Sequence, residues 1–375
     1  MLEGKQFTLE DVHQTYKAKD AWWTVLLVDP VASRLVVPVA NRTNITPNQI
    51  SLVSFTIGMV AAYCFYMSTT GSLITGAILY HISFILDCMD GKIARLKGTG
   101  SMFGVLLDIM LDHIRVVICT VALTFGLFYK TGDYTILMLA LLFIFAYFFR
   151  HYTALTIYKL RRQMKGRLNK ARRRLKRAEK RQSRAELLNV ENMLNIVTDE
   201  PTNERLKRLK GTYEEQLETL PTGIASASSA VGQETAHTGD RDAGGNSAHI
   251  ADAVEGTDKA EVVDEEQLPV SQRKTDLQHG FKQKFTLYLR IRDALLTKRI
   301  RMHLFSGIEF QMFLFVVAPV AYFFSEVMNV FKGTMLFGSI LLLAFELAII
   351  YKLWMSTRDF ESEMALIAEE RLQYD

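Results

Sequence analysis

Apolar residues are concentrated in long runs along the chain, and polar segments separate these runs. An α-helix needs about 20 apolar residues to cross a bilayer. We expect six such helices, at residues 50–68, 72–94, 104–128, 134–158, 304–324 and 333–354. The pattern therefore predicts an all-α integral membrane protein with six transmembrane helices.

The N-terminal region contains a further, shorter apolar run. Trp22 and Trp23 stand before it, and Pro30 and Pro38 interrupt it. Tryptophan is enriched where a membrane meets water, so we expect residues 16–39 to form an interfacial helix that is too short to span. A seventh spanning helix is the alternative. The residues before this run are acidic, whereas a signal peptide opens on a basic region, so we expect no signal peptide.

The longest polar segment, residues 161–302, separates the fourth and fifth apolar runs. It begins with the basic block RRQMKGRLNKARRRLKRAEKRQSR and continues as a periodic charged stretch, which indicates a solvated helix or coiled coil. A stretch rich in Gly, Ser, Ala and Thr follows and predicts disorder. Because the basic block adjoins a membrane helix, positive-inside bias places it in the cytosol, near anionic lipid headgroups. It lacks interleaved aromatic residues and any nucleic-acid-binding module, which argues against nucleic acid as a partner.

Six crossings with this insertion inside leave both termini in the cytosol. We expect five segments: a cytosolic and interfacial N-terminal region (1–48), helices one to four (49–160), a cytosolic insertion (161–302), helices five and six (303–356) and a cytosolic tail (357–375).

Composition agrees with a membrane protein. The chain has 375 residues, of which 49% are hydrophobic, and a formal net charge of +4. Cys64, Cys88 and Cys119 fall in or beside apolar runs, so we expect free thiols that pack as small apolar groups. Their number and spacing indicate neither a disulfide scaffold nor a zinc site.

The stretch DCMDGKIARLKGTGSMFGVLLDIMLDH, residues 87–113, places four carboxylates at the predicted cytosolic edge. Asp87 and Asp90 end the second helix, and Asp108 and Asp112 lie one turn apart on one face of the third. The linker LKGTGS contains glycines that suit a tight reversal, so the two pairs should face each other. Carboxylates near a membrane are costly unless something compensates their charge. Hard divalent cations do so, and such ions neutralise charge in phosphoryl transfer.

The same stretch resembles the signature of the CDP-alcohol phosphatidyltransferases, D-x2-D-G-x2-A-R-x8-G-x3-D-x3-D. Every fixed position is matched, by Asp87, Asp90, Gly91, Ala94, Arg95, Gly104, Asp108 and Asp112. The resemblance extends to the six-helix layout, the interfacial N-terminal helix and the segment TPNQIS that opens the first helix. The long insertion is a departure, because the family usually has a short connection there.

The resemblance implies a reaction and a set of roles. A CDP-linked donor would bind with two Mg²⁺ or Mn²⁺ ions, an acceptor hydroxyl would attack the β-phosphorus, and CMP would leave. The implied metal ligands are Asp87, Asp90, Asp108 and Asp112, with Asp112 also the general base. The implied donor contacts are Gly91, Ala94, Arg95, Ser101, Asn48 and Ser51. A structural role, such as a helix cap, is the alternative for Ser101, Asn48 and Ser51.

Further charged residues fall in the cytosolic halves of the predicted helices, namely Arg115, Arg150, His151, Glu309 and Glu346. Charges this deep usually face a cavity, so we expect one chamber for the acceptor, with Arg115, Arg150 and Glu309 as contacts. Arginines bind phosphates well, which favours an anionic acceptor such as a phosphorylated polyol. The alternative is that Arg150 pairs with Glu309 or Glu346, or extends outward.

The expected function is phospholipid synthesis from CDP-diacylglycerol and a polar alcohol. A CDP-alcohol donor with diacylglycerol as acceptor is the alternative within the same chemistry. A cation transporter or a membrane scaffold that presents the insertion would be a different class. A transporter predicts internal repeats, and none is clear. The resemblance further implies a homodimer in the cell membrane with its active site facing the cytosol.

Overall fold

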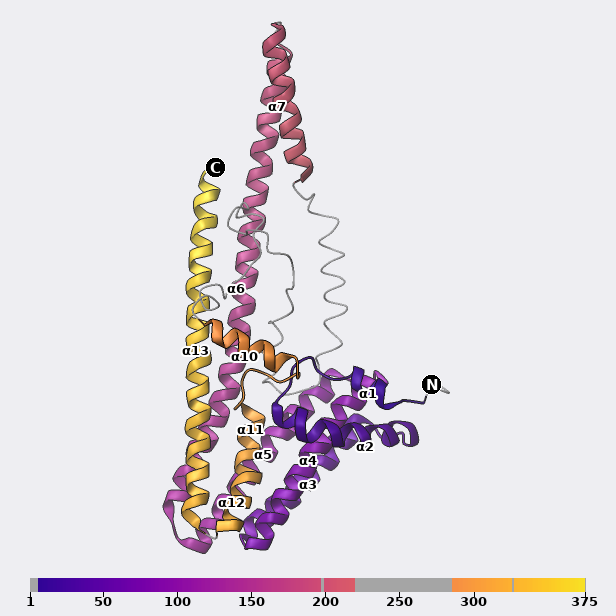
Figure 1. The fold of residues 1–375 in the computed structure, drawn as a ribbon, viewed down its shortest axis with the longest axis vertical. Coiled ribbons are helices and arrows are strands. Elements are labelled where there is room, and N and C mark those ends of the chain that lie inside the picture. The colour runs from indigo at the N-terminus through magenta and orange to yellow at the C-terminus, as the bar shows by residue number, and fades with distance from the viewer. Residues whose placement is uncertain (1–5, 197–198, 220–284, 326, 375) are drawn as a thin grey trace. The chain divides into compact units, whose positions relative to one another are not determined.

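The computed structural model describes residues 6–196, 199–219, 285–325 and 327–374. This described part is helical, and its single isolated β-bridge joins Asp20 to Ile300. The all-α prediction is therefore confirmed (Figure 1). The predicted disorder of the Gly- and Ser-rich stretch concerns residues outside the described ranges.

The N-terminal half contains α1 (Leu9–Gln14), the π-helix η1 (Thr24–Val28), α2 (Asp29–Arg42), α3 (Pro47–Met67), α4 (Thr70–Lys97), α5 (Met102–Thr131) and α6 (Tyr134–Leu194). The remaining elements are α7 (Glu200–Thr219), α10 (Thr286–Leu296), α11 (Gly307–Met312), the π-helix η3 (Phe313–Val317), α12 (Ala318–Ser325) and α13 (Met328–Leu372).

Six helical stretches in the described ranges are long and apolar enough to cross a membrane. They are Thr24–Arg42, Pro47–Met67, Thr70–Lys97, Tyr134–Leu194, Gly307–Ser325 and Met328–Leu372. Five of them overlap helices expected from the sequence. The expected third helix corresponds to α5, which is 30 residues long but is not among the six. Its first half carries Asp108, Asp112 and Arg115.

The sixth stretch is the N-terminal run that we expected to be too short to span. That expectation about its length is wrong, since Thr24–Arg42 has 19 residues and a mean hydropathy of 1.3. Pro30 does not break α2 because it lies in the first turn, where the missing N–H costs nothing, and Pro38 is accommodated inside the helix. Figure 1 shows α2 running across the direction of α12. The interfacial position of this segment stays a prediction.

The hydrophobic core lies between the membrane helices, and α3 packs against both α4 and α5. Aromatic rings fill the core where α11 and η3 meet the other helices. Phe143 stacks on Phe310 with ring centroids 4.2 Å apart, and Tyr80 contacts Phe315 at 4.3 Å. These contacts join α4, which carries the first half of the motif, to η3, and they join α6 to α11.

The described residues form two compact units. One contains residues 6–158 and 285–351, and the other contains residues 159–219 and 352–374. The second unit has its own small core of Met164, Leu168, Leu175 and Ile367. A hydrogen-bonded ion pair of 3.1 Å between Arg172 and Glu363 also joins α6 to α13 there. The charged stretch after residue 160 is thus helical, as the sequence predicts.

Candidate active site

Three motif carboxylates converge where α4 ends and α5 begins. One carboxylate oxygen from each of Asp87, Asp90 and Asp108 lies within 4.8 Å of the others. We call these three residues the carboxylate cluster. Asp90 is buried, and the other two are partly buried. Three anions at this spacing repel strongly outside bulk water, so the cluster needs a counter-charge.

The turn between the two helices brings the cluster together. Gly98 follows the last residue of α4 with φ +63°, a left-handed conformation that ends a helix readily only at glycine. Ser101 then caps α5, because its hydroxyl accepts a hydrogen bond of 3.0 Å from the Gly104 N–H. The tight reversal predicted from LKGTGS is therefore present. Ser101 has the capping role that was the alternative to donor contact.

Asp112 lies near the cluster but is not one of its three members. Its carboxylate accepts a hydrogen bond from Nη2 of Arg115, and the same nitrogen lies 3.2 Å from Oδ1 of Asp87. Nη1 of Arg115 donates to Ser54 at 2.8 Å and to Ser83 at 3.0 Å. Arg115 therefore neutralises motif carboxylates, and this geometry does not favour its expected contact with the acceptor.

Two candidate donor contacts from the start of α3 reach the motif. Ser51 donates a hydrogen bond to Asp90 Oδ2. Asn48 lies against Gly104, since a Cβ added at Gly104 would be 2.7 Å from Asn48 Oδ1. A larger residue at 104 would displace the Asn48 side chain. These contacts explain why the first helix must start beside the motif.

The remaining donor candidates lie along the last turns of α4. Gly91, Ala94 and Arg95 are partly buried. The Nε of Arg95 donates to the carbonyl of Thr15 at 2.8 Å. One function of Arg95 is therefore to hold the N-terminal segment against the motif helix.

The candidate acceptor residues are buried, but they do not all face one another. Arg150 pairs with Glu346 at 3.0 Å, which was the structural alternative considered for it. Glu309 accepts hydrogen bonds from the backbone N–H and hydroxyl of Ser306, at 3.1 and 2.8 Å. His151 packs edge-on against His113, with ring centroids 4.4 Å apart.

Sequence reasoning missed the N-terminal residues that surround the motif. Lys92 occupies no fixed position of the motif, and it pairs with Asp29 of α2 at 2.9 Å. Arg299 reaches Asp29 at 3.4 Å and covers the ring of Tyr16 at 4.2 Å. Burial lowers the pKa of Lys17, and the charges of Arg95 and Arg301 lower it further, against the opposing effect of Asp20. No local pattern marks these residues, because their partners are distant in sequence.

The residues of the cluster suit a hard divalent cation. Carboxylate oxygens are the ligands that Mg²⁺, Mn²⁺ and Ca²⁺ prefer, whereas zinc and copper sites usually contain nitrogen or sulfur. Each cluster member can offer one oxygen to a shared ion. The cluster therefore fits the metal that the motif implies.

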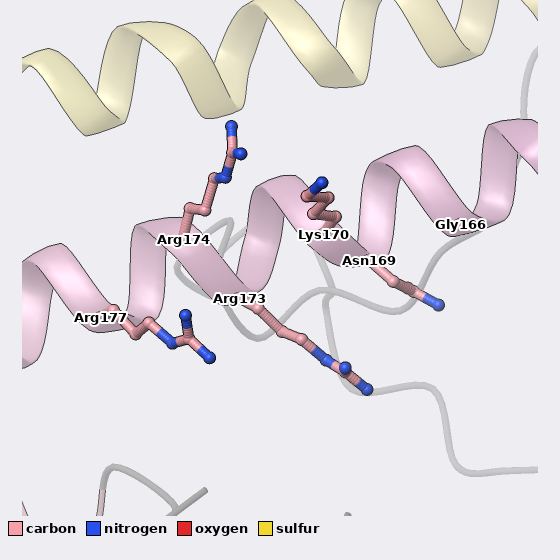
Figure 2. A pocket seen from close by; sticks show the side chains of 6 residues that line it. All are labelled: Gly166, Asn169, Lys170, Arg173, Arg174 and Arg177. Atoms are coloured by element: carbon pink, nitrogen blue, oxygen red, sulfur yellow. The ribbon is translucent and has the colours of Figure 1, made fainter. Parts of the chain in front are cut away.

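A separate pocket lies in the second unit, on α6. Four of its six lining residues are basic, and the lining consists of Gly166, Asn169, Lys170, Arg173, Arg174 and Arg177. Figure 2 shows Arg174 pointing toward α13, whereas Arg173 and Arg177 point away from it. The pocket has no acidic lining residue. It is therefore a basic surface of the second unit.

Comparison with known proteins agrees with the motif. Residues 44–178 match the family described as CDP-alcohol phosphatidyltransferase. This stretch contains α3 to α5, the whole motif and the first part of α6. The match confirms, over these residues, the resemblance that the motif indicates.

Several curated proteins are similar to part of the chain. The phosphatidylinositol phosphate synthase of Corynebacterium glutamicum is 35% identical over 89 residues, which are 24% of this chain and 37% of that protein. The archaetidylinositol phosphate synthase of Methanothermobacter thermautotrophicus is 34% identical over 97 residues, 26% of this chain and 48% of that protein. The bifunctional IPC transferase and DIPP synthase of Thermococcus kodakarensis is 39% identical over 69 residues, which are 18% of this chain and 15% of that protein. The alignments thus cover less than half of each relative.

Proposed function

We propose that the protein is a membrane-bound phosphotransferase that moves a substituted phosphoryl group from a CDP-linked lipid to the hydroxyl of a phosphorylated polyol. The observation that carries this proposal is the convergence of Asp87, Asp90 and Asp108 on one point at the junction of α4 and α5. An oxygen from each residue within 4.8 Å is the arrangement that holds a cation beside a phosphate group.

In the proposed reaction, a hydroxyl oxygen of the acceptor forms a bond to the β-phosphorus of the donor. The bond from that phosphorus to the bridging oxygen breaks, and CMP leaves. Asp87, Asp90 and Asp108 would hold divalent cations, two Mg²⁺ or Mn²⁺ ions in the family pattern, with Asp112 as a further ligand. Such ions stabilise the charge that develops on the phosphate oxygens. The carboxylates would bind and orient the ions, and the nucleophile is the acceptor hydroxyl.

Asp112 is the proposed general base that takes the proton from the acceptor hydroxyl. Its hydrogen bond to Arg115 fixes the carboxylate on the side of the cluster. Arg115 is fixed in turn by Ser54 and Ser83, at 2.8 and 3.0 Å. A base that accepts one strong hydrogen bond retains lone pairs for a proton, and positioning decides how well it works. We propose Arg115 as the residue that positions Asp112.

The donor is proposed to lie between α3 and the end of α4. Asn48 and Ser51 approach from α3, and Gly91, Ala94 and Arg95 lie on α4. Ser51 is hydrogen-bonded to Asp90, so a nucleotide bound along α3 would adjoin the cluster. Small residues at 91 and 94 leave room for the diphosphate near the helix. This arrangement supports a CDP-linked donor, which we propose to be CDP-diacylglycerol.

The acceptor is proposed to be an inositol phosphate or a similar phosphorylated polyol. Two of the relatives named above are synthases of phosphatidylinositol phosphate and archaetidylinositol phosphate. The basic part of α6 supports a cytosolic position for the adjoining end of the membrane helices, through positive-inside bias. A homodimer in the cell membrane and the absence of a nucleic-acid partner remain predictions from the sequence.

The test is CMP release by the purified, detergent-solubilised protein. CDP-diacylglycerol is supplied with Mg²⁺ or Mn²⁺ and with inositol phosphate, inositol, glycerol phosphate or serine in parallel. The expected result is metal-dependent release with inositol phosphate and none with unphosphorylated inositol. Asp90→Asn is the inactive control. Release that requires CDP-choline or CDP-ethanolamine with diacylglycerol would overturn the assignment of donor and acceptor.

A further inference from the structure

Arg301 is buried and forms no direct ion pair within the described part of the chain. It is only 2% exposed, and its Nη2 donates to the Ser306 hydroxyl at 3.1 Å. Its Nε and Nη1 are buried and have no hydrogen-bond partner among the described residues. A buried guanidinium that lacks a carboxylate or phosphate is strongly destabilising. Such an arrangement indicates a position where an anion binds.

A second cation lies beside Arg301. An isolated parallel β-bridge joins Asp20 to Ile300. In this pairing, the Arg301 N–H donates to the Asp20 carbonyl at 2.9 Å, and Asp20 N–H donates to the Arg299 carbonyl at 2.8 Å. The Arg299 guanidinium donates to the Lys17 carbonyl at 3.1 and 3.2 Å. The pairing thus holds Lys17 close to Arg301.

Burial lowers the pKa of Lys17 most, Asp20 raises it, and repulsion by the charges of Arg95 and Arg301 lowers it further. Lys17 also interacts electrostatically with Asp108 of the carboxylate cluster. Asp20 attracts Lys17, but within the described residues the Lys17 side chain makes no hydrogen bond or ion pair that would offset the repulsion directly. An anion between Lys17 and Arg301 would relieve it, and would lie beside the cluster that binds metal.

We propose that Arg301 and Lys17 form a binding site for a phosphate group of a substrate, next to the carboxylate cluster. The proposal rests on the proposed function for the identity of the substrate. A phosphate accepts two parallel hydrogen bonds from an arginine fork, and the point charge of a lysine ammonium attracts it. Both the phosphate of a polyol acceptor and the diphosphate of the donor have this chemistry.

The site lies outside the segment that the family model matches. Lys17 precedes residues 44–178, and Arg301 follows them at the end of the long insertion. The buried Glu309 connects to Arg301 through Ser306, and its Oε1 has no hydrogen-bond partner in the described part of the chain. An acceptor hydroxyl beside the phosphate would donate a hydrogen bond to that oxygen. The chain thus adds its own substrate contacts to the family motif.

The experiment compares Arg301→Gln, Arg301→Lys and Lys17→Gln with the unchanged full-length protein. Arg34→Gln on the exposed side of α2 is the matched control. KM is measured separately for CDP-diacylglycerol and for inositol phosphate. A second measurement needs no turnover: the increase in melting temperature that inorganic phosphate gives in detergent, since a ligand of the folded state stabilises it.

We expect Arg301→Gln and Lys17→Gln to raise one KM by about tenfold or more, and to remove the phosphate-dependent stabilisation. A rise in the KM of inositol phosphate assigns the site to the acceptor, and a rise in the KM of CDP-diacylglycerol assigns it to the donor. Arg301→Lys should give a KM and a phosphate-dependent stabilisation between those of the unchanged protein and Arg301→Gln, since it keeps the charge and loses the fork. Arg34→Gln should change neither.

The proposal is overturned if folded variants retain both KM values and the full phosphate-dependent stabilisation. If Arg301→Gln does not fold, Lys17→Gln provides the test. Lys17 is only partly buried, so we expect this variant to fold. Failure of the proposed function would look different. No protein would then release CMP, while the phosphate-dependent change in melting temperature would still report whether this site binds an anion.

Discussion

The ammonium group of Lys92 lies 2.9 Å from a carboxylate oxygen of Asp29, and both side chains are buried. Lys92 directly follows the Asp90–Gly91 pair of the motif, whereas Asp29 begins α2. Asp29 also lies 3.4 Å from Arg299, near the end of the insertion. The pair therefore ties the N-terminal region to the motif helix at the position where the candidate active site forms.

The first prediction concerns this ion pair. Asp29→Ala should lower the free energy of unfolding by about 3–5 kcal/mol, because it leaves Lys92 buried without a counter-charge. The double variant Asp29→Leu with Lys92→Met should recover much of that loss, since it removes both charges. Thermal unfolding in detergent measures both. Equal destabilisation by the single and double variants would mean that packing, and not the uncompensated charge, sets the cost.

The second prediction separates metal binding from proton transfer. Asp90→Asn should weaken binding of Mn²⁺ and abolish CMP release, because Asp90 belongs to the carboxylate cluster. Asp112→Asn should lower the rate of CMP release by about two to four orders of magnitude. Its loss of Mn²⁺ affinity should be smaller than that of Asp90→Asn, because the main contact of Asp112 is Arg115. Mn²⁺ titration followed by electron paramagnetic resonance gives the affinities. Equal loss of Mn²⁺ affinity in both variants would show that Asp112 is primarily a ligand.

The third prediction concerns Arg150, which the sequence suggested as an acceptor contact. Its pairing with the buried Glu346 at 3.0 Å favours a structural role. Arg150→Gln should therefore destabilise the protein by about 3–5 kcal/mol. Among molecules that remain folded, KM for the acceptor should change by less than about threefold. A strong rise in acceptor KM at unchanged donor KM would restore Arg150 to the acceptor site.

The fourth prediction concerns the contact between α3 and α5. A Cβ added at Gly126 would lie 2.2 Å from the Tyr66 carbonyl oxygen and 2.3 Å from Ser68 Oγ. Gly126→Ala should lower the free energy of unfolding by about 1–3 kcal/mol through overpacking. Gly71→Ala is the matched control, because nothing lies within 4 Å of its Cβ position. A melting temperature for Gly126→Ala at or above that of Gly71→Ala would contradict this account of the packing.

Much of the site follows from the sequence because its residues are close along the chain. Helical periodicity places Asp87 and Asp90 near one end of α4, and the glycine-containing linker returns the chain toward Asp108. The structure brings these three residues together as expected. Local spacing was sufficient here, since one helical turn and one tight reversal determine the geometry.

The remainder of the site depends on contacts between distant segments, which leave no periodic pattern. Asp20 pairs with Ile300 across the whole insertion, and Arg150 pairs with Glu346 of α13. The apolar run at residues 24–42 was also expected to be too short to span a membrane. That expectation was wrong because the two prolines suggested a break that the helix does not show. Apolar content alone likewise could not show that the fourth membrane helix continues as α6 to Leu194.

The central claim is that the protein transfers the β-phosphoryl group of a CDP-linked lipid. CDP-diacylglycerol labelled with ³²P at the β-phosphate tests it directly, with Mg²⁺ and inositol phosphate present. The account predicts that the label moves into a new lipid product, that the released CMP carries none, and that Asp90→Asn forms neither. Label in a water-soluble product, or a labelled lipid formed equally well without divalent metal, would contradict it.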